Sequence, residues 1–76
     1  MESHVAPSNA DFHVAALFSA KAARTGGVLR RNRSWADREI GFARLRDEVV
    51  AREFHLLVCG TQYVIVCWRG PIRTIC

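Results

Sequence analysis

Residues 54–68 read FHLLVCGTQYVIVCW. Two apolar runs rich in β-branched and aromatic residues, 54–59 and 63–68, flank the short connection Gly60-Thr61-Gln62. Runs of this composition on either side of a glycine-containing connection are typical of an antiparallel β-hairpin. This stretch therefore predicts two paired strands, and the rest of the fold has to be arranged around them.

Both predicted strands are apolar on both of their faces. Side chains alternate between the two faces of a strand, so a two-residue turn would divide them into two sets. One set is Phe54, Leu56, Val58, Tyr63, Ile65 and Cys67, and the other is His55, Leu57, Cys59, Val64, Val66 and Trp68. An antiparallel sheet with one face in water normally alternates apolar and polar residues. Because this one does not, either helices cover both faces or a second chain covers one, and we expect a homodimer or another protein partner.

The sequence on either side of the hairpin predicts a third strand and further helices. A turn at Arg69-Gly70-Pro71 predicts that residues 72–76 return as the third strand of a β-meander. Residues 10–24 are good helix formers, which Asn9 can cap and Gly26-Gly27 can stop. Residues 28–33 fit either a brief edge strand or an extended linker.

A second helical region is predicted over residues 34–53. Ser34 is its expected N-cap, in an approximate capping box that Asp37 completes. Arg44 and Glu48, and Glu48 and Arg52, are spaced as i,i+4 ion pairs, which we place on the face exposed to water. Gly41 lies inside this region, and glycine either is tolerated within a helix or marks a turn between two helices.

These elements define the expected fold class. We expect a small single α+β domain over residues 9–76, in which two or possibly three helices precede a three-stranded antiparallel β-meander. Residues 1–8 are expected to form a flexible tail.

If Gly41 is a turn, the order of elements becomes helix, short strand, helix, turn, helix and hairpin. This layout resembles that of winged-helix DNA-binding domains. The resemblance implies that residues 42–53 form the recognition helix and that Gly60-Thr61-Gln62 forms the tip of the wing. The recognition helix would then offer Arg44, Arg46 and Arg52 to DNA.

If Gly41 lies inside one continuous helix, the layout is similar to a different group of proteins. The region from this helix through residues 54–57 then resembles the start of double-stranded-RNA-binding domains and of the small HicA-type RNA-cleaving toxins. Those toxins carry a histidine just after the first β-turn glycine, whereas this chain continues from Gly60 as Thr61-Gln62-Tyr63. This resemblance therefore implies binding without cleavage, and a toxin-like ribonuclease is the weakest of the readings.

The charge of the chain is concentrated in one segment. The formal net charge is +4. Residues 21–33 hold five cations and no acid, while the charges elsewhere nearly cancel. Arginine suits forked recognition of phosphate, and an aromatic side chain nearby can stack on a base. The candidate nucleic-acid-binding residues are Lys21, Arg24, Arg30, Arg31, Arg33 and Trp35.

No residue pattern in the chain indicates catalysis, and 76 residues are too few for the larger enzyme folds. The three cysteines, Cys59, Cys67 and Cys76, lack the spacing of a zinc site, so we expect them to serve in packing rather than as ligands. We expect no metal, no cofactor, no membrane span and a cytoplasmic location. The leading function is a non-enzymatic binding or regulatory module for DNA or RNA. The alternative is a protein-interaction module that uses an apolar sheet face.

Overall fold

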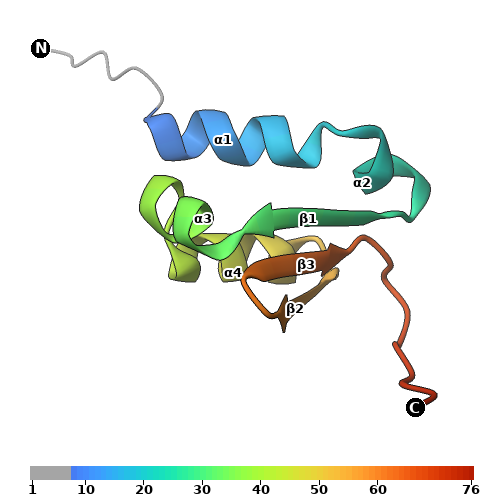
Figure 1. Cartoon of the computed structure of the whole chain (residues 1–76). Helices are drawn as coiled ribbons and strands as arrows, with labels where there is room; N and C mark the ends of the chain where they lie inside the picture. Colours follow the sequence, from blue (N-terminus) through green and yellow to red (C-terminus); the bar gives the residue numbers. More distant parts are fainter. Residues whose placement is uncertain (1–7) are drawn as a thin grey trace, which may run out of the picture.

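The computed structural model describes residues 8–76, which form a three-stranded antiparallel sheet and four helices (Figure 1). In chain order the elements are α1 (Asn9–Phe18), α2 (Lys21–Thr25), β1 (Val28–Asn32), α3 (Arg33–Glu39), α4 (Phe42–Ala51), β2 (His55–Cys59) and β3 (Gln62–Val66). The predicted α+β class is confirmed. The tail predicted over residues 1–8 lies outside the described residues, apart from Ser8.

The predicted hairpin is present, and its turn holds two residues. β2 pairs with β3, with Cys59 opposite Gln62 and His55 opposite Val66. Gly60 has φ +61°, the left-handed conformation that two-residue hairpin turns require at their first position. The two-residue register fixes which side chains share a face, in the two sets that the sequence predicts.

The third strand is not the one predicted. It is β1, which pairs with β3 so that Leu29 lies opposite Ile65, and the strand order is β1-β3-β2. The prediction of a strand over residues 72–76 is wrong, because that segment has no strand partner and Ile75 is 83% exposed. Of the two options for residues 28–33, the edge strand is correct, since Leu29 reaches the core from it.

The first predicted helix is divided into two. Ala20 adopts an extended conformation with ψ 152°, which ends α1 and lets α2 begin on a new axis. Ser8 rather than Asn9 caps α1, in a reciprocal capping box with Asp11. Gly26 ends α2 in the left-handed conformation, as the predicted stop requires. Across residues 8–76, no helix has both the length and the apolar character needed to cross a bilayer.

Gly41 is a turn between two helices. Its φ is +94°, a conformation that residues with a Cβ rarely adopt, so of the two alternatives for Gly41 the turn between two helices is correct. Asn32 rather than Ser34 caps α3, since its side chain accepts a hydrogen bond from the Trp35 backbone N–H. The order of elements is therefore that of the winged-helix layout, with one additional short helix, α2.

The core lies between the helices and one face of the sheet. Its buried side chains are Val14, Leu17, Leu29, Ala36, Ile40, Leu45, Val49, Tyr63, Ile65 and Cys67. The strand members of this set share one face by register. On the opposite face Val28 is 53% exposed and Leu57 is 46% exposed. Among the described residues, the helices therefore cover only one of the two apolar faces.

The end of α4 holds a residue in a strained backbone conformation. Glu53 has φ +62°, while the N–H groups of Glu53 and Phe54 bond the carbonyls of Val50 and Val49. These two bonds make a Schellman motif, whose left-handed position glycine usually occupies. We expect Glu53→Gly to raise the free energy of unfolding by about 1 kcal/mol, as measured by urea denaturation. A decrease in stability would contradict this account of the cap.

Candidate nucleic-acid interface

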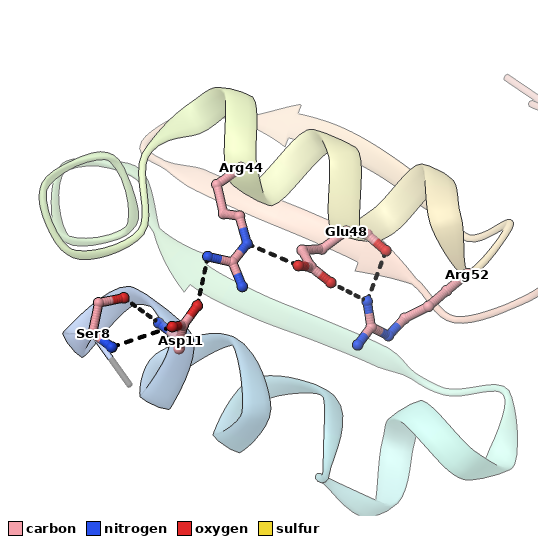
Figure 2. A network of polar contacts seen from close by, with 5 residues as sticks. All are labelled: Ser8, Asp11, Arg44, Glu48 and Arg52. Carbon is pink, nitrogen blue, oxygen red and sulfur yellow. Dashed lines mark hydrogen bonds and ion pairs between the residues drawn. The ribbon is translucent and has the colours of Figure 1, made fainter. Parts of the chain in front are cut away.

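Arg44 and Glu48 of α4, together with Arg52 at its C-cap, lie on the side of the helix that faces α1 (Figure 2). Glu48 accepts hydrogen bonds from Arg44 Nε at 2.8 Å and from Arg52 Nη1 at 2.7 Å. Arg44 Nη1 also pairs with Asp11 of α1 at 2.8 Å. The guanidinium of Arg52 lies 3.9 Å from the ring centroid of Phe18, also in α1. The predicted i,i+4 pairs are present, but they form a half-buried bridge between two helices rather than a face exposed to water.

This network removes most of the charge that the winged-helix resemblance assigned to the recognition helix. Arg44 and Arg52 are engaged with residues of α1 and with Glu48. Arg46 remains on the outer surface, where it pairs with the neighbouring Asp47 at 3.3 Å. The outer surface of α4 is therefore close to neutral, and a neutral helix is poorly suited to enter a DNA groove.

The same network makes stability depend on pH in the acid range. Hydrogen bonds from Arg52 and Arg44 lower the pKa of Glu48, and a hydrogen bond from Arg44 lowers the pKa of Asp11. A carboxyl with a lowered pKa in the folded state stabilises the protein above its unfolded pKa of about 4. This stabilisation is lost as the pH falls from about 5 through the folded pKa values.

We therefore expect Glu48→Gln to flatten the acid side of the stability profile. The measurement is the urea midpoint between neutral pH and about pH 3, a range that contains the loss expected for lowered carboxyl pKa values. Asp47→Asn is the matched control, because Asp47 lies on the same helix but faces solvent. Equal flattening by both variants would contradict a specific role for Glu48.

The predicted basic residues lie along β1 and at both of its ends. Lys21 and Arg24 belong to α2, which packs against β1, and Arg33 is the first residue of α3. Arg30 and Arg31 are consecutive on β1, so they point to opposite faces of the sheet. All except the half-buried Arg31 are exposed. The structure thus places Arg30, Arg31 and Arg33 along the second half of β1 and the start of α3, with Arg30 and Arg31 on opposite faces of the sheet, and places the two α2 cations beyond the other end of the strand.

None of these five cations forms an ion pair with an acid within the described part of the chain. The cations that do so are Arg38, Arg44, Arg46 and Arg52. Arg31 and Arg33 each donate one hydrogen bond to a backbone carbonyl, of Arg30 and Gly60 respectively. Most of their guanidinium donors are therefore free to bind an anion from solution.

Asp37 is an acid that lies near Arg33, and it accepts a hydrogen bond from another side chain. Asp37 lines a small hollow together with Arg33, Gly60 and Thr61 at the hairpin tip. The Tyr63 hydroxyl donates a hydrogen bond of 2.5 Å to Asp37 Oδ1. This bond to Asp37, together with burial, raises the pKa of Tyr63, so the phenol stays protonated and continues to donate. Arg33 also lies 5.6 Å from the Tyr63 ring centroid, which fixes its position beside the hairpin.

Trp35 lies in α3 with Arg33, but its ring packs against α1 and the core. It is half-buried and meets His13 of α1 edge-on, with 4.9 Å between the ring centroids. It packs against the core, so its ring mainly joins α3 to α1. The aromatic member of the predicted site is therefore turned toward the protein interior.

A different aromatic residue and a different cation lie beside Arg24. Trp68 is 55% exposed, and together with Arg24 and Arg69 it lines a hollow of about 770 Å³. The sequence analysis places Trp68 on a strand face and Arg69 in a turn, and neither is among the predicted site residues. The sequence signal for this site is the pair Trp68-Arg69, an aromatic residue followed by a cation directly before the Gly70-Pro71 turn.

The cysteines occupy three different environments. Cys67 is 4% exposed and packs in the core, where burial raises the pKa of its thiol. This confirms the predicted packing role for Cys67, but the same prediction is wrong for Cys59 and Cys76, which are exposed. Within residues 8–76, no group of three or more histidine, cysteine, aspartate or glutamate side chains is placed to hold a metal ion.

An apolar groove of about 630 Å³ runs between α4 and β2. Its exposed walls include Phe42 and Val50 of α4, Leu57 and Val58 of β2, and Ile72 of the segment after β3. It has the composition of a protein-binding surface rather than of a nucleic-acid-binding one. The chain therefore separates an apolar side, around α4 and β2, from the cation-bearing strand β1.

Comparison with protein-family models, curated proteins and solved structures gives no match to this chain.

Proposed function

We propose that this protein is a non-enzymatic binding module that contacts the phosphate backbone of nucleic acid through the cations of residues 21–33. The proposal rests on the difference between the cations that are paired with acids and those that are not. The cations of α4 are paired with acids, whereas those of residues 21–33 have no acidic partner in the part of the chain described. Unpaired arginines keep their forked donors for phosphate. The free cysteines are consistent with a reducing, cytoplasmic setting.

Duplex DNA is the first ligand to test, because the order of elements is that of the winged-helix layout. The neutral outer surface of α4 argues against reading of bases by that helix. We therefore assign the affinity to Arg30, Arg31 and Arg33, around the start of α3, with Lys21 and Arg24 in support. Contacts to phosphate carry no sequence information, so this mode predicts binding with little sequence preference.

The experiment is a salt titration of binding to a fluorescently labelled DNA duplex, followed by anisotropy. With five cations each neutralising one phosphate, log K is expected to fall against log salt with a slope of about −4.5. A scrambled duplex of equal length is expected to bind equally well. No binding at low salt, or a slope near zero, would exclude the proposal.

A second candidate function is self-association through the open sheet face. It is favoured by the exposure of Val28 and Leu57 on a face that no described helix covers. Apolar association between two copies responds little to salt, which distinguishes it from phosphate binding. We expect a dimer mass by sedimentation at tens of micromolar and a monomer for Leu57→Lys. A monomeric parent protein would exclude this candidate.

A further inference from the structure

We infer that the hollow formed by Arg24, Trp68 and Arg69 binds an unpaired nucleobase together with its phosphate. This inference rests on the proposed function and specifies it further, since it names single-stranded nucleic acid as the ligand of an adjoining site that shares Arg24. None of the residues that line this hollow is acidic, and two of them, Arg24 and Arg69, are cations.

The indole of Trp68 is accessible and fixed in position. Cys67 points into the core, so Trp68, the next residue, points outward, and it is 55% exposed. Gly70 lies so close to the ring that a Cβ there would be 2.6 Å from the Trp68 Nε1 atom. The carbonyl of Gly70 accepts a hydrogen bond from His55 Nε2 at 2.6 Å, which ties this segment to β2. A ring held in this way loses little freedom when a base stacks on it.

The two cations of the hollow are available to a phosphate. Arg24 lies in the last turn of α2, and Arg69 follows Trp68 directly. Neither forms an ion pair with an acid among residues 8–76. An exposed aromatic ring flanked by unpaired arginines is the combination that binds single strands, in which the bases stack on the ring and the phosphates meet the cations.

The choice of an unpaired base follows from the geometry of the ligand. In a duplex each base is stacked on its neighbours, so its flat surface cannot reach the indole without unstacking. A single strand presents its bases freely, and stacking on aromatic residues tolerates every base. Trp68 is therefore expected to add affinity for single strands and to leave duplex binding unchanged.

The test compares two ligands that differ only in their bases: a labelled oligothymidylate and an abasic oligonucleotide of the same length. Trp68→Leu is expected to weaken binding to oligothymidylate by roughly 5- to 150-fold and to leave abasic binding unchanged. Trp68→Phe is expected to restore part of the loss. Ile75→Ala, which changes another exposed apolar residue of the same segment, is the control and is expected to have no effect.

Two further variants make the result independent of folding defects. In Trp35→Phe the only tryptophan is Trp68, and its fluorescence is expected to be quenched by oligothymidylate but not by the abasic strand. Gly70→Ala would displace the indole without removing a cation, and is expected to weaken binding to oligothymidylate alone.

The inference is overturned if Trp68→Leu binds oligothymidylate as tightly as the parent protein, or if the abasic strand loses as much affinity. Either result leaves the proposed function standing while duplex binding retains its salt dependence. Loss of that salt dependence is the separate outcome that excludes the proposed function.

Discussion

Changing Arg30, Arg31 and Arg33 together to alanine is expected to reduce the salt slope of duplex DNA binding from about −4.5 to about −1.8. Each cation that leaves the interface removes about 0.9 from the slope, because one fewer phosphate releases its counterions. Between 50 and 200 mM salt the parent protein should lose about 500-fold in affinity, and the variant about 12-fold. The readout is anisotropy of the labelled duplex over that range.

The control for this variant removes the same net charge elsewhere. Arg38 and Arg46 are paired with neighbouring acids, and Arg73 lies in the segment after β3. Changing these three to alanine is expected to change the slope by no more than about 0.9, the contribution of one phosphate contact, since none of the three belongs to the proposed interface. Equal losses in the two triple variants would show that net charge alone drives binding, and would contradict the assignment to β1 and α3.

Leu45→Ala is expected to lower the free energy of unfolding by roughly 2–5 kcal/mol. Leu45 is 1% exposed and lies on the face of α4 that meets the core, among the largest fully buried side chains. Its truncation removes apolar burial and leaves a cavity between α4 and the sheet that the backbone cannot fully close. Urea denaturation monitored by circular dichroism measures the change. Because this domain is small, the upper part of that range would leave it largely unfolded at ambient temperature.

Val50→Ala is the matched control, because it removes apolar atoms from the opposite side of the same helix. Val50 is 65% exposed, so the change in stability is expected to stay within about 0.5 kcal/mol. A loss comparable to that of Leu45→Ala would mean that the α4 surface is buried in solution, and would point to an occupied groove.

The hairpin could be predicted from sequence because its signals are local. Apolar β-branched residues flank Gly60, and glycine readily takes the positive φ that the turn needs. The two-residue turn then determines which side chains of the two strands share a face. The turn at Gly41 was an open alternative for the same reason, since glycine permits a left-handed conformation without requiring one.

The identity of the third strand could not be predicted, because it depends on contacts between distant residues. Residues 72–76 and 28–32 both have sequences compatible with a strand. Leu29 is buried opposite Ile65, whereas the side chain of Ile75 has no core to enter. The β-propensity of two such segments does not show which one forms the strand when burial decides between them.

The sequence pattern also could not predict which face of α4 points toward the core. In this helix, Phe42, Leu45 and Val49 form one apolar stripe and Ala43 and Val50 form a neighbouring one, so either stripe could face the core. Leu45 and Val49 are buried whereas Val50 is exposed, and this orientation places Arg44 beside Asp11 and Arg52 beside Phe18. For the candidate site, the cations were found because their clustering is visible in the sequence. Trp35 and Trp68 could not be told apart, since their exposure is a property of the packed chain.

The central position of β3 has a consequence for the order of folding. β3 reaches β2 across a two-residue turn, but it reaches β1 only after the chain has passed through α3 and α4. Closing the longer loop costs more entropy, so the hairpin is expected to form early and β1 to dock late. In the native ensemble β1 is then the first strand to detach, and its amides should exchange with deuterium sooner than those of β3. The strand that carries Arg30 and Arg31 thus pairs with only one other strand of the sheet, and a bound polyanion would slow its exchange.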